Sequence, residues 1–148
     1  MIIWYKDDKL KILFDKEPYT GTKKILPNMT KDEIENIRKK PLILNNRIFC
    51  RIIYQGISYG FFIKKGYDWD GATIPPFAWI LIGQSLDPEF YIPSLIHDVL
   101  CENHNYINNN RYLSTLVLDG LLCANKVNSL KRWVMKHSVD NFQKALWK

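Results

Sequence analysis

The chain has 148 residues, of which 47% are hydrophobic and 14% aromatic, and it carries a net charge of +6. This composition excludes an intrinsically disordered chain and favours one folded domain over residues 1–148. No hydrophobic run approaches the roughly 18 residues that a membrane span needs, and the N-terminus lacks the layout of a signal peptide. We therefore expect a cytoplasmic protein without a membrane span. The three cysteines are widely spaced and odd in number, which favours free thiols.

The charge is distributed unevenly along the chain. Residues 1–65 carry a net charge of +7, residues 66–125 carry −6 and residues 126–148 carry +5. Solvated surface charge accounts for many such patterns. An acidic centre between two basic flanks also fits a carboxylate site inside a shell that attracts anions.

Residues 1–65 are predicted to be rich in strands. Runs of β-branched and aromatic residues mark four strands, over Ile2–Tyr5, Leu10–Phe14, Arg47–Gln55 and Ser58–Lys64. In Arg47–Gln55, hydrophobic residues also recur at every second position. The Gly56 that lies between the last two strands is a hairpin signal.

The segment between the second and third strands is predicted to contain a loop and a short helix. Pro and Gly residues favour a loop over Lys16–Asn28. Thr30 and Glu33 have the spacing of a capping box, which predicts that a helix begins there and runs over Lys31–Lys39. Its many charged residues indicate an exposed helix.

Residues 66–148 are predicted to be mainly helical, from the spacing of their hydrophobic residues. The expected segments are Phe77–Ile82, Pro93–Glu102, Arg111–Lys126 and a last helix that begins near Asn128. A polar loop is expected over His104–Asn110. The predicted fold class is α+β, with a small N-terminal antiparallel sheet packed on a C-terminal three-helix half.

A histidine within a hydrophobic segment is the first candidate for chemistry. His97 is either a packed imidazole, hydrogen-bonded to a carbonyl or a water, or a functional one that a carboxylate orients. The adjacent Asp98 projects about 100° round the helix and cannot orient His97 directly. Asp119 lies in the next predicted helix, inside a hydrophobic run, and can approach His97 if the two helices form an antiparallel hairpin.

A carboxylate that holds an imidazole is the orienting half of a general-base dyad. We therefore expect His97 and Asp119 to touch, and to be the catalytic residues if the protein is an enzyme. The same two residues with Asp70 would instead suit a divalent metal ion. Neither arrangement has diagnostic spacing, so no cofactor is assigned, and metal dependence and enzymatic activity stay open.

Aromatic residues surround two carboxylates just before the helices. The aromatic residues are Tyr67, Trp69, Phe77 and Trp79, and the carboxylates are Asp68 and Asp70. The rings either cap the core where the sheet meets the helices or form a stacking platform for a base or sugar. In the second interpretation, the ligand-binding residues are Trp69, Asp70, Thr73, Trp79, Asp98, His104 and Arg111.

Three short stretches resemble a known family. They are Asp70-Gly71-Ala72-Thr73-Ile74-Pro75, Leu95-Ile96-His97-Asp98-Val99-Leu100 and the later helix with Asp119. The phage and prophage family known as domain of unknown function thirteen-fifty-three has an Asp-x-Ala-Ser-Ile-Pro turn, a Leu-His-Asp-x-Leu helix and a later Ala-Asp pair. The resemblance covers about Ile63–Val127, with Thr73 and Leu118 where Ser and Ala are usual, and it implies a phage origin but no activity. A weaker resemblance, to prokaryotic phospholipases A2, lacks the paired cysteines and the calcium loop.

The leading hypothesis is a small phage accessory protein that binds a small anionic, nucleotide-like ligand between the aromatic-acid turn and the His-Asp helix. It would sequester or destroy a signal of host defence in the cytoplasm of the host cell. One alternative is a His/Asp or metal-dependent hydrolase of a phosphoester or lipid, and another is a virion or assembly protein. A homo-oligomer stays open. Nucleic acid is not expected as a partner, because the basic C-terminal helix lacks interleaved aromatic residues.

Overall fold

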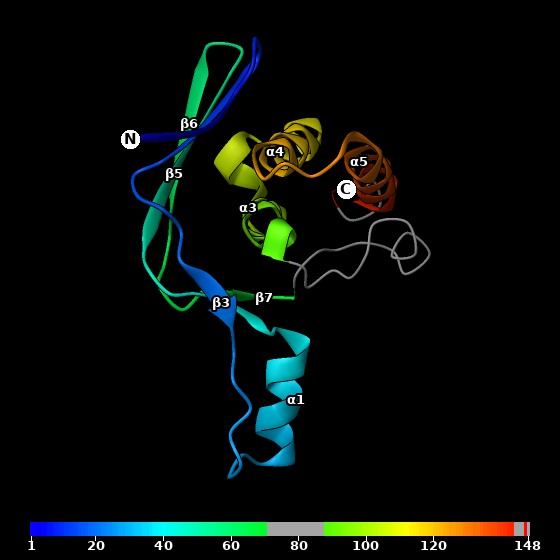
Figure 1. The fold of residues 1–148 in the computed structure, drawn as a ribbon. Coiled ribbons are helices and arrows are strands. Elements are labelled where there is room, and N and C mark those ends of the chain that lie inside the picture. The colour runs from blue at the N-terminus through cyan, green and yellow to red at the C-terminus, as the bar shows by residue number, and fades with distance from the viewer. Residues whose placement is uncertain (71–87, 144–146, 148) are drawn as a thin grey trace.

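The structure is a computed structural model that describes residues 1–70, 88–143 and 147. It confirms the α+β class, with an N-terminal antiparallel sheet on one side and helices on the other (Figure 1). The predicted helical segment Phe77–Ile82 lies outside the described residues.

The main sheet has four antiparallel strands in the order β1-β2-β5-β6. Their bounds are β1 Ile2–Lys6, β2 Leu10–Phe14, β5 Ile48–Tyr54 and β6 Ile57–Ile63, within two residues of the prediction. The β5–β6 hairpin turns at Gln55 and Gly56, whose φ angles are 51° and 75°. Two positive φ angles are typical of the tight turn whose twist matches the strands.

Strict alternation along β5 separates the two faces of this sheet. Ile48, Cys50 and Ile52 are fully buried on the face that packs on the helices, whereas Phe49 and Arg51 are partly exposed on the other. We call these the inner face and the outer face. They arise because successive side chains of a strand point to opposite sides.

A second, small sheet has the strand order β3-β4-β7 and was not predicted. Its strands are β3 Thr20–Thr22, β4 Leu42–Leu44 and β7 Asp68–Trp69. The expected loop Lys16–Asn28 therefore contains a strand. Strands of two or three residues carry no measurable periodicity, and their hydrogen bonds join segments that are distant in the sequence.

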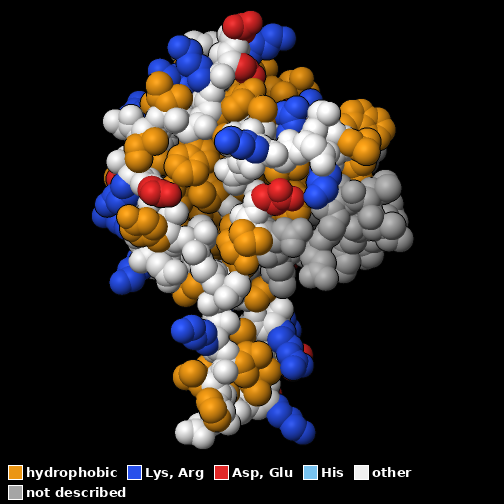
Figure 2. Space-filling model, in the orientation of Figure 1, with side chains coloured by type: hydrophobic (Ala, Val, Ile, Leu, Met, Phe, Trp, Pro, Cys, Tyr) orange, Lys and Arg blue, Asp and Glu red, His pale blue; other side chains and the backbone are white. Residues whose placement is uncertain are grey.

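Helix α1, Lys31–Lys39, lies between β3 and β4 and projects from the body of the molecule (Figure 1). The Glu33 amide donates to Thr30 Oγ1 at 3.2 Å, which confirms the predicted cap. None of its residues is buried, and Lys and Arg side chains flank hydrophobic ones along this projection (Figure 2).

The remaining helices of the described residues form the second layer. They are η1 Pro88–Phe90, α3 Tyr91–Glu102, η2 His104–Ile107, α4 Arg111–Ala124 and α5 Ser129–Gln143. The expected loop His104–Asn110 thus begins with a 3₁₀ turn. Gly120 of α4 lies against the ring of Tyr5 on β1, and a Cβ atom there would come within 2.8 Å of that ring. This close approach brings α4 against the sheet.

Two further expectations can be compared with the structure. Cys50, Cys101 and Cys123 form no disulfide, as predicted, and burial raises the pKa of the Cys50 thiol. Within the described ranges, no helix has the length and hydrophobicity that crossing a membrane requires.

Candidate functional site

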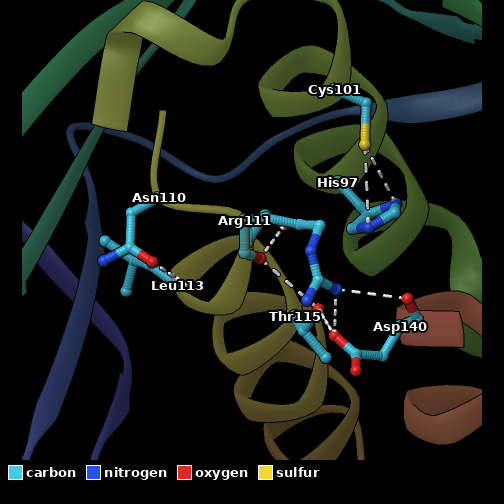
Figure 3. A network of polar contacts seen from close by, with 8 residues as sticks. His97, Cys101, Asn110, Arg111, Leu113, Thr115 and Asp140 are labelled. Carbon is cyan, nitrogen blue, oxygen red and sulfur yellow. Dashed lines mark hydrogen bonds and ion pairs between the residues drawn. The ribbon is translucent and has the colours of Figure 1, made fainter. Parts of the chain in front are cut away.

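His97 lies on α3 and points into the helical layer. Its side chain is 2% exposed, and the Cys101 sulfur, one turn further on, is 3.7 Å from both ring nitrogens (Figure 3). Burial lowers the pKa of His97 to about 4. The imidazole is therefore neutral near pH 7.

Asp119 does not form the expected pair with His97. Leu118 of α4 lines a cavity of about 10 Å³ beside His97, with Met135 and Val139 of α5, and this volume holds at most about one water. Asp119 is one residue further round the helix and adjacent to Gly120, which lies against the Tyr5 ring on β1. Burial and the contact with Asp7 are the larger causes of the raised pKa of Tyr5, and the charge of Asp119 adds to them. Among the described residues, the hydrogen bonds of His97 go to Cys101 and none joins it to Asp119. The Asp119 carboxylate and the His97 imidazole thus lie on different sides of α4. Leu118 faces His97, and Asp119 points elsewhere because adjacent helical residues differ by about 100°.

Arg111 holds two helices together. Asn110 caps α4 by accepting from the Leu113 amide at 3.0 Å, which places Arg111 in the first turn. The Arg111 guanidinium forms an ion pair with the Asp140 carboxylate of α5 and donates to the Asp140 carbonyl at 3.1 Å (Figure 3). Thr115 donates to the same carboxylate at 3.3 Å. The predicted ligand-binding role of Arg111 competes with this intramolecular pair.

Trp69 belongs to the core and not to an exposed platform. Its side chain is 1% exposed, and its indole nitrogen donates to Ser94 Oγ of α3 at 2.9 Å. This bond joins β7 to the start of α3. The interpretation in which the aromatic residues cap the core is therefore the correct one for Trp69.

The other predicted ligand-binding residues are distributed over several surfaces. Asp70 is exposed and Asp98 is half-buried. His104 stacks on Trp147, with ring centroids 3.8 Å apart and planes 10° apart. Thr73 and Trp79 lie outside the described residues.

A groove of about 710 Å³ lies where the β6–β7 turn approaches the end of α3. It is lined by Lys40, Arg47, Phe62, Ile63, Lys64, Gly66, Tyr67, Asp68, Val99, Glu102, Asn103 and Tyr106. Its volume falls in the range of roughly 300–1,000 Å³ that is usual for small-molecule sites. Gly66 makes the turn possible, because its φ of +92° suits glycine, and its amide donates to the Leu44 carbonyl at 2.8 Å.

Positive charge prevails in this groove. Lys40, Arg47 and Lys64 line it, and the carboxylate of Asp68 is already bound by Lys23 at 2.6 Å. Glu102 is the remaining acid of the lining. A groove with this balance attracts anions while keeping a carboxylate that accepts hydrogen bonds.

The hydroxyl of Tyr67 is a buried polar atom in the wall of this groove. Among the described residues, it forms no hydrogen bond of ordinary geometry. Burial, followed by the charges of Glu102 and Asp98 and by a contact with the Glu102 carboxylate that falls short of an ordinary hydrogen bond, raises the pKa of Tyr67. The hydroxyl therefore stays protonated, and a buried donor of this kind gains from a ligand acceptor.

Sequence reasoning missed most residues of the groove. Lys40, Arg47 and Tyr106 come from three segments with no shared motif, and only folding brings them together. The sequence feature most closely related to the groove was the net positive charge of residues 1–65. In the parts of the chain that the structure describes, no group of three or more His, Cys, Asp or Glu residues is arranged to hold a metal ion.

Comparison with known proteins gives one family. The family model described as "Protein of unknown function (DUF1353)" matches residues 47–139, well over half of the chain. No curated protein and no solved structure gave a significant match. The matched region begins with Arg47 in the groove and includes α3 and α4.

Proposed function

The chain belongs to the family described as Protein of unknown function (DUF1353), and we propose that it binds a small anionic ligand with a flat ring, such as a nucleotide, in the groove beside α3. The observation that carries this proposal is the combination of three cationic side chains with three aromatic ones on one groove. The cationic residues are Lys40, Arg47 and Lys64, and the aromatic ones are Phe62, Tyr67 and Tyr106.

The cationic and aromatic groups are already held in place by the fold. The Arg47 guanidinium lies 4.2 Å from the centroid of the Phe62 ring, and Tyr106 stacks on Phe61 at 5.1 Å. Arg binds phosphate oxygens through paired N–H donors, and an aromatic ring stacks on any nucleobase. Less side-chain freedom is lost on binding when such groups are ordered beforehand.

The polar residues of the same groove suit the rest of a nucleotide. The Glu102 carboxylate accepts hydrogen bonds from sugar hydroxyls or from base amino groups, and Asn103 offers both donors and acceptors. The Tyr67 hydroxyl supplies a donor. In a phage-infected cell, a protein with this groove would sequester a nucleotide signal of host defence.

Calorimetry with nucleoside monophosphates, cyclic nucleotides, nucleosides and inorganic phosphate tests the proposal. The double variant Arg47→Gln/Lys64→Gln should bind nucleotides at least about tenfold more weakly, since each phosphate contact through a charged group is strong. The matched control is Lys31→Gln/Lys39→Gln, which removes the same charge from the exposed helix α1. Absence of nucleotide binding, or equal loss in both double variants, would refute the proposal.

Recovery of the ligand separates a binding protein from an enzyme. We expect a bound nucleotide to be released intact when the protein is denatured. Turnover that disappears in His97→Ala would replace this expectation with the hydrolase alternative, because a neutral imidazole is the form that acts as a general base.

A further inference from the structure

The outer face of the four-stranded sheet is not covered by any described helix. Helices α3, α4 and α5 all lie on the inner side (Figure 1). Phe62 of β6 is 56% exposed on the outer face, beside the partly exposed Phe49 and Arg51 of β5. We propose that this outer face binds single-stranded nucleic acid, a partner that the residues of the C-terminal helix do not predict.

Aromatic rings and arginines alternate across two neighbouring strands of this face. Phe49 lies opposite Phe62 in the β5–β6 register, and their ring centroids are 4.8 Å apart. Arg47 lies over the Phe62 ring at 4.2 Å and Arg51 over the Phe49 ring at 5.5 Å. The result is a continuous strip in the order Arg47, Phe62, Phe49, Arg51.

A glycine of β6 allows a ring of this strip to lie close to the backbone of the sheet. Gly60 lies opposite Arg51 in the register, and a Cβ atom there would come within 2.5 Å of the Phe49 ring. The missing side chain allows the ring to lie over the backbone of β6. Ser58 holds the end of the strip by accepting a hydrogen bond from Arg51 at 2.9 Å. An exposed ring held in this way is a platform for a base.

Positive charge continues from the strip toward the β1 edge. Lys11 of β2 lies directly opposite Lys6 of β1, and like charges at opposite positions disfavour the sheet. Asp15 lies beside the strip and accepts a hydrogen bond from the Phe49 amide at 2.7 Å, and Asp7 and Asp8 follow Lys6 in the turn between β1 and β2. In Figure 2, Lys and Arg side chains recur among hydrophobic ones along the margin that the sheet occupies. A polyanion would relieve the repulsion between the two lysines.

The exposed rings favour a single strand over a duplex. Stacking on Phe49 or Phe62 needs a base whose face is open, whereas the bases of a duplex are stacked on each other. A small anion alone would not need the rings. DNA and RNA share the chemistry that this face recognises, so the experiment includes both. Arg47 and Phe62 also line the groove beside α3, whereas Phe49, Arg51 and Lys11 do not. The experiment therefore substitutes residues that belong to the outer face alone, so that its outcome does not depend on nucleotide binding in the groove.

Fluorescence anisotropy with labelled oligo-dT and oligo-U of about 15 nucleotides tests the inference, with a duplex of the same length as the reference. We expect binding at roughly micromolar concentrations, weaker at higher salt, and weaker for the duplex. The variant Lys11→Gln/Arg51→Gln should lose at least about tenfold in affinity, and the salt dependence of log K should become shallower by about 1.4, the value for two phosphate contacts. Phe49→Leu should weaken binding while leaving that salt slope unchanged.

Two controls make the result decisive. Lys31→Gln/Lys39→Gln on α1 removes the same charge elsewhere and should change affinity less than about twofold. Mononucleotide binding in the groove should persist in Lys11→Gln/Arg51→Gln, so that failure at one surface is distinguished from failure at the other. Equal loss in the two double variants would overturn the inference, as would duplex binding as tight as single-strand binding or no binding of either oligonucleotide. Thermal melting shows that each variant is folded.

Discussion

The two faces of the four-stranded sheet are built from alternate residues of the same strands, but they differ in burial, in residue type and in the helices that cover them. On β5, Ile48, Cys50 and Ile52 are fully buried, whereas Phe49 and Arg51 remain partly exposed. The inner face packs on α3 and α4. The outer face carries rings and cations that no described helix covers.

This difference indicates that stability and binding are separable in this fold. Burial of hydrophobic surface on the inner face supplies the stability. The outer Phe49–Phe62 pair remains partly in water, so its removal costs less free energy of unfolding. Neighbouring positions in the sequence therefore allow matched tests, because one substitution reports on the core and the next reports on the surface.

The largest effects are expected where buried side chains of the inner face are shortened, and Ile52 is one of these. Ile52→Ala should lower the free energy of unfolding by about 2–5 kcal/mol, because it removes a buried side chain and leaves a cavity. Ile53→Ala, one residue further on and partly exposed, should cost clearly less. Urea denaturation of both variants measures the difference. Equal losses would contradict the assignment of the two faces.

An intermediate effect is expected from acid, through His97 in the layer that covers the inner face. Burial lowers the pKa of His97 from 6.5 to about 4, so the unfolded chain takes up this proton first as the pH falls. The contribution of His97 to the free energy of unfolding keeps its full value above pH 6.5. It declines as the pH falls through 6.5 toward 4, by up to about 3 kcal/mol.

The variant His97→Gln isolates this contribution. Between pH 6.5 and 4, its free energy of unfolding should fall less steeply than that of the wild type. The difference between the two slopes corresponds to the uptake of up to about one proton on unfolding. Chemical denaturation at a series of pH values gives both slopes. Identical slopes would mean that the folded protein protonates His97 as readily as the unfolded chain does.

The smallest effect on stability is expected on the outer face. Phe62→Ala should lower the free energy of unfolding by about 1 kcal/mol or less, which corresponds to its cation–π contact with Arg47. Phe61, its neighbour on the inner face, is only 4% exposed, and Phe61→Ala should cost about 3–5 kcal/mol. Thermal and urea unfolding compare the pair. A larger loss for Phe62→Ala would show that the outer face is also part of the core.

The sequence by itself determined the elements whose signals are local. Alternation located β5, because a half-buried strand shows its period directly, and the aromatic residues after the Gly56 turn signal located β6. Thr30 and Glu33 located the start of α1, because a cap needs only neighbouring residues. The motifs around Asp70 and His97 identified the family, which the match over residues 47–139 shows.

Tertiary structure alone decided which of these residues meet. Strands β3, β4 and β7 are short and are stabilised by pairing across long stretches of chain, so no local pattern predicted them. Asp119 lies on the tyrosine side of α4, and His97 contacts Cys101 instead, because the rotation of each helix is set by packing of its hydrophobic residues. The groove and the aromatic strip have the same origin, since they combine side chains from separate segments that only the folded chain brings together.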